Sequence, residues 1–297
     1  MNKIVFYAVA EHHAVAIRPI YEQMKRQGKN VEAVFNQPFQ KASEYSSIVS
    51  STAAEAGMAK AKDTIYHFHS LSPYHVNPSE QDYRYIPLFK AVMFPGEWWV
   101  TKWKNLPKHA VVGWPKSDIL FQLPETPHER TVLYASSMND FLRMQTLKEM
   151  IHLSETADFN LMVKPHGGTA MWFPRQHQAM KETCLSKRVE IIEHAVDITT
   201  LFPLVDVIVS ESSGALWEFL ATDKPAIQMT QATRYGRPLF QGILHSNITD
   251  LGKTIQKCFD NPSICKDIGW REKIMGKVDG KSTDRAIRFI EEVFGDE

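Results

Sequence analysis

The segment from Val205 to Met229 constrains the fold more than any other part of the chain, because its pattern predicts a strand, a tight polar turn, a helix and a second strand in succession. Residues 205–209 form a short apolar run rich in β-branched side chains, as in a buried parallel strand. Residues 215–221 have a helical composition, and the polar turn before them supplies residues that begin helices. We therefore expect a parallel α/β sheet here.

The polar turn, Ser210-Glu211-Ser212-Ser213-Gly214, is the first candidate binding site. A helix that begins near Ser213 points its free N–H groups and its dipole toward the carboxyl edge of the sheet, where α/β proteins bind the phosphates of nucleotides. The hydroxyl groups of Ser212 and Ser213 add hydrogen-bond donors. The carboxyl group of Glu211 would repel a phosphate unless it is protonated or paired with a cation. We expect Ser210, Ser212, Ser213 and Gly214 to bind phosphate.

Short apolar runs alternate with helical patterns along the whole chain, which is typical of repeated βα units. In the first half, the expected elements are strands at 3–10, 31–35, 64–68, 91–94 and 110–112, a helix over 15–26, and a loop over 73–84. In the second half, they are strands at 132–135, 160–163, 189–192, 205–209 and 226–228, and helices at 248–259, 263–275 and 283–294. No G-x-G-x-x-G fingerprint follows the first strand, so a dinucleotide-dependent dehydrogenase is disfavoured.

The expected domain boundary is the stretch 122–130, where two prolines and several charges interrupt the pattern. A chain of 297 residues is long enough for two α/β domains with separate cores, and we place them at residues 1–122 and 131–297. The three cysteines are odd in number and lack C-x-x-C spacing, which argues against a disulfide framework and a structural zinc site.

Charge and hydropathy narrow the class of protein further. The 34 lysine and arginine residues balance 34 aspartate and glutamate residues, so the net charge does not indicate a nucleic-acid partner, although a nucleic-acid acceptor stays open. No apolar run is long enough to span a bilayer, and the run at 4–10 is too short for a signal peptide. We expect a cytoplasmic protein without a transmembrane segment.

Five short motifs, taken together, resemble those of the CDP-glycerol glycerophosphotransferases, enzymes that build teichoic-acid-like polymers. The resemblance covers most of the chain, from about residue 63 to residue 294, in the same order and spacing. The motifs are GWPKSD at 113–118, VLYASS at 132–137, VKPH at 163–166, the turn at 210–214 with its following helix, and DGKS at 279–282. The resemblance implies a GT-B fold, in which two Rossmann-like domains face each other across a cleft and a terminal helix crosses back onto the first domain.

Lys164 and His166 follow an apolar strand, so both side chains are expected at its carboxyl end. The two glycines after His166 allow the backbone to approach a ligand closely. The resemblance implies that His166 lies at the phosphates of the donor, where an imidazolium or the Lys164 ammonium neutralises charge. The alternative is that His166 merely forms a hydrogen bond within its own loop.

Glu218 occupies the helix position at which the resembling family usually has an aspartate. By analogy with other GT-B enzymes, this carboxylate binds the ribose hydroxyls of the nucleotide. The alternative is a solvated glutamate on the helix surface, although its apolar neighbours leave little of the helix polar. Arg234 and Arg237 follow the next strand and are further candidates for binding the donor.

The general base is expected in the first domain. His69 is the closer match to the histidine of the W-H-G-T-x-x-K segment of the resembling family, although the glycine and lysine of that segment are absent here. A neutral imidazole is suited to activating a hydroxyl group. His12 and His13 compete for this role, and Glu11 could orient either ring. Adjacent histidines also suggest a metal, but no third ligand is indicated, so we expect no metal.

We expect an enzyme of the GT-B transferase class that moves a group from a nucleotide-activated donor to an acceptor hydroxyl, with no cofactor besides the donor. Glycerol phosphate from CDP-glycerol is the preferred transferred group, and a polymer is one of the acceptors left open. The alternatives are a glycosyltransferase that uses a UDP-sugar or another nucleotide sugar, a non-hydrolysing sugar-nucleotide epimerase, and a nucleotide-binding regulatory protein without activity. Asp118 is expected to cap a turn rather than to take part in catalysis.

Overall fold

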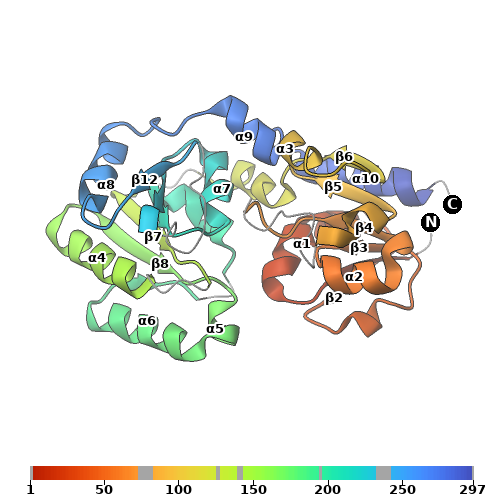
Figure 1. The fold of residues 1–297 in the computed structure, drawn as a ribbon, viewed down its shortest axis with the longest axis horizontal. Helices are drawn as coiled ribbons and strands as arrows, with labels where there is room; N and C mark the ends of the chain where they lie inside the picture. The colour runs from red at the N-terminus through yellow and green to blue at the C-terminus, as the bar shows by residue number, and fades with distance from the viewer. Residues whose placement is uncertain are drawn as a thin grey trace. The chain divides into compact units, whose positions relative to one another are not determined.

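The computed structural model describes residues 3–72, 83–124, 128–138, 143–193, 196–231 and 242–295. The chain forms two compact units, each with its own sheet (Figure 1). The first unit consists of Met1–Phe121 and Gly269–Glu297, and the second consists of Gln122–Ile268. Two Rossmann-like α/β domains were expected, and the two six-stranded parallel sheets with flanking helices confirm that fold class.

The first unit contains a parallel sheet with the strand order β2-β1-β3-β4-β5-β6. Its strands are β1 (Ile4–Ala8), β2 (Val31–Phe35), β3 (Ile48–Ser50), β4 (Thr64–His67), β5 (Ala91–Phe94) and β6 (Lys108–Val111). Its helices are α1 (Glu11–Arg26), α2 (Ala53–Lys60), α3 (Glu97–Val100), α9 (Ile268–Met275) and α10 (Ser282–Gly295). The chain leaves β1 on one side toward β2 and returns on the other side at β3, so the topological switch point lies between β1 and β3.

Helices α1 and α10 cover one face of this sheet. On α1 the buried residues Ile17, Ile20 and Met24 recur every three or four positions, so they form one apolar stripe. This stripe joins Ile290 and Phe294 of α10 in a core against the strands. The C-terminal helix is therefore part of the first unit.

The second unit contains a parallel sheet with the strand order β12-β11-β10-β7-β8-β9. Its strands are β7 (Thr131–Ala135), β8 (Asn160–Lys164), β9 (Glu190–Ile191), β10 (Val207–Ser210), β11 (Ala226–Met229) and β12 (Leu244–Ser246). Its helices are α4 (Arg143–Thr156), α5 (Thr169–Trp172), α6 (Pro174–Ser186), α7 (Ala215–Phe219) and α8 (Leu251–Asp260). This is the order of a dinucleotide-type Rossmann sheet, and its switch point lies between β7 and β10.

Several elements differ from the prediction. The strands β3 and β12 are only three residues long and were not predicted, because such short runs carry no periodicity. The helix expected over 215–221 is α7, which ends at Phe219 and continues as a 3-10 helix over Leu220–Thr222. The predicted loop 73–84 lies largely outside the described residues, and Tyr83–Leu88 forms a 3-10 helix.

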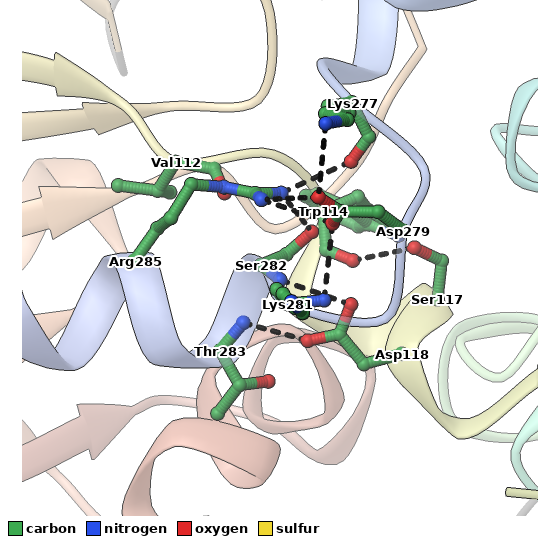
Figure 2. Close-up of polar contacts among 10 residues, drawn as sticks. All are labelled: Val112, Trp114, Ser117, Asp118, Lys277, Asp279, Lys281, Ser282, Thr283 and Arg285. Atoms are coloured by element: carbon green, nitrogen blue, oxygen red, sulfur yellow. Dashed lines mark hydrogen bonds and ion pairs between the residues drawn. The ribbon is translucent and has the colours of Figure 1, made fainter. Parts of the chain in front are cut away.

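The motifs at 113–118 and 279–282 meet in the first unit (Figure 2). The carboxylate of Asp118 accepts hydrogen bonds from the backbone amides of Ser282 at 3.1 Å and Thr283 at 2.6 Å. These amides begin α10 and have no partner within the helix. Asp118 therefore caps a helix that is distant in sequence, and not the turn that follows it.

Arg285 of α10 binds the same region. Its Nη1 atom contacts both carboxylate oxygens of Asp279 at 2.9 and 3.0 Å, and its Nε atom donates to the carbonyl oxygen of Val112 at 2.9 Å. Gly113 has a φ of +89°, and a Cβ atom there would lie 2.5 Å from Ser282 Oγ. Only glycine satisfies both conditions without rearrangement. The two motifs thus form a structural clamp that holds α10, shown in Figure 2.

Cys184 and Cys258 are buried in the second unit as free thiols. Burial raises the pKa of Cys184 to about 11 and that of Cys258 to about 12, so both are neutral apolar residues at physiological pH. Within the described residues, no helix has the length and apolar character needed to cross a bilayer.

Candidate functional site

In the second unit, polar side chains gather where four adjacent strands end. Because β7, β8, β10 and β11 run parallel, the loops that follow them leave the same edge of the sheet. Lys164 ends β8 in register with Ala135 of β7, and Ser210 ends β10 in register with Gln228 of β11. This edge includes the β7/β10 switch point, where open α/β sheets bind ligands.

A hydrogen-bond network joins the loops after β7 and β10 at the switch point. The amide of Ser212 donates to Ser137 Oγ at 2.9 Å, and the two hydroxyl oxygens lie 3.1 Å apart. Glu211 is fully buried, and its carboxyl oxygens accept from the Tyr134 hydroxyl at 2.5 Å and from the Ser137 amide at 3.0 Å. Glu211 therefore holds the two loops together.

The remaining serines of the turn accept local hydrogen bonds. Ser210 Oγ accepts from the amide of Ser213 at 3.2 Å, and Ser213 Oγ accepts from the amide of Ala215 at 3.3 Å. A serine that accepts a bond still has its own hydroxyl proton to donate. Gly214 immediately precedes α7 and brings the backbone of the turn into the helix. The turn is thus ordered by its own side chains.

Lys164 and His166 belong to the loop after β8. Lys164 is buried, with 5% of its surface exposed, and its Nζ atom lies 3.5 Å from the carbonyl oxygen of Pro165. The amide of Gly168 donates to His166 Nδ1 at 3.0 Å, so the neutral imidazole carries its proton on Nε2. His166 therefore forms the hydrogen bond within its loop that was the alternative to phosphate binding, and its Nε2 atom carries the ring's N–H donor.

Gly168 also packs closely against the loop that follows β7. A Cβ atom at Gly168 would lie 2.5 Å from the sulfur of Met138. The side of Gly168 on which a Cβ atom would stand is therefore occupied by the chain itself.

Glu218 is buried in α7, with 6% of its surface exposed, so it is not a solvated surface glutamate. Its position one turn into α7 places it in the helix that begins at the switch point. Arg234 and Arg237 lie outside the described residues.

In the first unit, three histidines and a threonine meet at the β1/β3 switch point. The rings of His13 and His69 stack, with centroids 4.0 Å apart and planes at 13°, and the His12 ring meets His13 edge to face at 4.4 Å. Thr52 Oγ1 lies 3.1 Å from His13 Nδ1. These residues follow three neighbouring strands, β1, β3 and β4, and we name them the histidine cluster.

Glu11 immediately precedes His12 in α1 and forms its own polar contacts. The carboxylate of Glu11 accepts from Arg18 at 2.5 Å and from Asn36 at 2.9 Å. Burial lowers the pKa of His12, and the nearby charge of Glu11 opposes that shift. Glu11 therefore acts on His12 through its charge.

His67 lies in the core, although it precedes His69 by two positions. It is fully buried, its Nδ1 atom donates to the carbonyl oxygen of Phe68 at 2.6 Å, and burial lowers its pKa to about 4. The strand ends at His67, so the two-residue alternation of side chains along a strand does not carry the rings of His67 and His69 to the same place.

Ser137 and Thr52 were not among the predicted site residues. Ser137 is the second residue after β7, a strand that was predicted, so its position at the carboxyl edge was a usable signal. Thr52 follows β3, which was not predicted, so no signal placed it. Among the described residues, no group of three histidine, cysteine, aspartate or glutamate side chains is arranged to hold a metal.

At the level of sequence, no protein-family profile and no curated protein match this chain. Its fold, however, is similar to solved GT-B-type structures. A variant of the wall teichoic acid polymerase TagF soaked with CDPG matches with a TM-score of 0.70 at 13% identity, over 99% of this chain and 89% of that one. The S. aureus MnaA–UDP structure matches with a TM-score of 0.69 at 12% identity, over 99% and 97%.

The UDP-GlcNAc 2-epimerase from Neisseria meningitidis bound to UDP-GlcNAc also matches, with a TM-score of 0.62 at 12% identity, over 98% of this chain and 99% of that one. At this identity the likeness establishes the fold and not the reaction. The similar structures therefore include both a teichoic acid polymerase and a sugar-nucleotide epimerase.

Proposed function

We propose that the chain is an enzyme that binds a nucleotide-activated donor at the β7/β10 switch point and transfers the activated group to an acceptor hydroxyl. The observation that carries the proposal is that Ser137 and Ser212 meet at the switch point of a Rossmann-ordered sheet, with Lys164 at the end of the neighbouring strand β8. A ligand that suits this edge is anionic and rich in oxygen acceptors, as a diphosphate is.

The strongest contribution to donor binding is assigned to Lys164. Two opposite unit charges about 4 Å apart attract by about 4 kcal/mol where the effective dielectric constant is about 20, whereas a single hydrogen bond to a charged group contributes about 1.5 to 3 kcal/mol. The Nε2–H group of His166 and the hydroxyl groups of Ser212 and Ser213 then orient the phosphate oxygens. Glu218, and the arginines at 234 and 237, complete the proposed donor site.

The acceptor hydroxyl is activated by the histidine cluster in the proposed reaction. With CDP-glycerol as donor, the acceptor oxygen attacks the β-phosphorus, and the bond from that phosphorus to the bridging oxygen breaks. Glycerol phosphate is transferred, CMP leaves, and the hydroxyl proton passes to an imidazole. The fold similarity to the TagF polymerase and the motifs at 163–166 and 279–282 support this choice of donor.

Sugar-nucleotide epimerisation is the second candidate. One similar structure is a UDP-GlcNAc 2-epimerase bound to UDP-GlcNAc, and another is the MnaA–UDP complex. The two reactions yield different products from different substrates. The enzyme is incubated with CDP-glycerol and a polyol-phosphate acceptor, or with UDP-GlcNAc alone, and the products are separated by ion-exchange chromatography. CMP release that depends on the acceptor supports transfer.

Appearance of the C2 epimer of UDP-GlcNAc, with CDP-glycerol left intact, would replace transfer with epimerisation. Accumulation of UDP from a nucleotide sugar and an acceptor would instead indicate a glycosyltransferase. Both proposed reactions rely on side chains for charge stabilisation, so we expect activity to persist in the presence of a chelator.

A further inference from the structure

The loops after β1 and β3 are tied together around one hydroxyl group, that of Thr52. The amide of Val9 donates to Thr52 Oγ1 at 3.1 Å, and His13 Nδ1 lies 3.1 Å from the same oxygen. Ser51 Oγ adds a bond to the carbonyl oxygen of His13 at 2.9 Å. The backbone and the ring of His13 are therefore both held by residues that follow β3.

The direction of the contact between Thr52 and His13 follows from counting protons. An amide can only donate, so the bond from Val9 uses an acceptor site of Thr52 Oγ1 and leaves the hydroxyl proton to be placed. Thr52 is 5% exposed, and a buried hydroxyl proton needs an acceptor. In the described part of the chain, the acceptor within hydrogen-bond distance of this hydroxyl is His13 Nδ1. Thr52 then donates to Nδ1.

We infer that Thr52 is a positioning residue that holds neutral His13 in the tautomer with its proton on Nε2. In that tautomer His13 is a hydrogen-bond donor at Nε2 and has no lone pair there to accept a proton. We assign His13 the role of hydrogen-bond donor to a substrate oxygen, and its stacked partner His69 the role of general base. This division of roles rests on the proposed function, but the tautomer itself does not.

Two substitutions at Thr52 form a matched pair. Thr52→Val removes the hydroxyl group with little change in shape, and Thr52→Ser keeps the hydroxyl group. The side chain of Thr52 does not cap α2, although Thr52 is the N-cap residue, so neither change removes a helix-capping bond. Thr52→Ala serves in place of valine if the valine protein does not fold.

The test is a long-range ¹H–¹⁵N correlation spectrum of the full chain with labelled histidine, recorded at pH 8.5 without substrate. At that pH an ordinary imidazole is neutral. The His13 signals are assigned by their loss in His13→Gln. We expect an unprotonated Nδ1 and a protonated Nε2 in the wild type and in Thr52→Ser, and a shift toward the other tautomer in Thr52→Val.

A protonated Nδ1 in the wild type would overturn the inference, and so would an unchanged tautomer in both the valine and alanine variants. The turnover assay gives a second readout, in which Thr52→Val lowers kcat by about tenfold or more and Thr52→Ser restores it, as for other partners that orient a functional histidine. If the protein binds no nucleotide donor, the proposed function fails while the spectrum still decides the role of Thr52.

Discussion

The imidazole rings of His13 and His69 stack 4.0 Å apart, although one follows β1 and the other follows β4. Neither strand alone creates this contact, because β3 lies between them in the sheet. Parallel pairing of all three strands carries the two rings to the same edge. The arrangement places a candidate general base, His69, beside a candidate hydrogen-bond donor, His13.

Replacing His69 is therefore expected to lower kcat by about two to four orders of magnitude, the range for loss of a general base. The change His69→Ala should leave donor affinity nearly unchanged, because the donor is assigned to the second unit. Steady-state kinetics with saturating donor measure the effect. His109→Ala is the matched control, because His109 is exposed in the same unit. Equal losses in both variants, or a loss in His12→Ala with none in His69→Ala, would remove His69 as the base.

The phosphate turn gives a second prediction. Ser213→Ala should weaken nucleotide binding by about 1 to 3 kcal/mol, since it removes one hydroxyl donor to a charged group. Gly214→Val should weaken it further, because a branched side chain would crowd the entry to α7. Titration calorimetry with CDP measures both, and Ser186→Ala, at the exposed end of α6, is the control. An affinity for Ser213→Ala equal to that of the control would rule out the turn as the phosphate site.

The clamp on α10 predicts an effect on stability and not on chemistry. Asp118→Ala leaves the amides of Ser282 and Thr283 without their acceptor, and loss of a helix cap lowers the free energy of unfolding by about 0.5 to 2 kcal/mol. Urea denaturation measures the loss, and Asp284→Ala, in the first turn of the same helix, is the comparison. A folded Asp118→Ala protein with wild-type stability would contradict the capping role.

His67 predicts a pH dependence of stability. Its pKa is lowered by burial from 6.5 to about 4, so the unfolded chain binds a proton at pH values where the folded protein does not. The free energy of unfolding must therefore fall as the pH drops from about 6.5 toward 4, by up to about 3 kcal/mol for this group. His67→Gln lacks the titrating ring, so its denaturation midpoint should change less between pH 7 and pH 5. Parallel pH dependence in the two proteins would show that another group is responsible.

The sequence predicted the elements that carry strong periodicity and long apolar runs. The strands at 31–35 and 91–94 have the predicted bounds, and α10 differs by one residue at each end. The three-residue strands β3 and β12 could not be predicted, because their pairing depends on neighbours that are distant in sequence. Without β3, the switch point of the first unit and the position of Thr52 were not accessible.

Side-chain environments were harder to predict than strand ends. The position of Lys164 at a carboxyl edge follows from the apolar run before it, but the burial of Glu211 and its bond to Tyr134 do not follow from local pattern. The same holds for Asp118, whose partners are the amides of Ser282 and Thr283. Such contacts depend on tertiary packing. Each of these two carboxylates holds together segments that are distant in sequence.

The proposed donor site is tested most directly by a calorimetric titration of the wild-type protein and Lys164→Met with CDP-glycerol and with UDP-GlcNAc. Methionine keeps the length of the buried side chain and removes its charge, while Lys187→Met is the control at an exposed lysine paired with Glu155. We predict saturable binding of one of these donors to the wild type and to the control, and a loss of at least about tenfold in affinity for Lys164→Met, since 1.4 kcal/mol corresponds to about a factor of 10. Absence of binding of both donors to the wild type, or equal affinity in the two lysine variants, would contradict a donor site at the β7/β10 switch point.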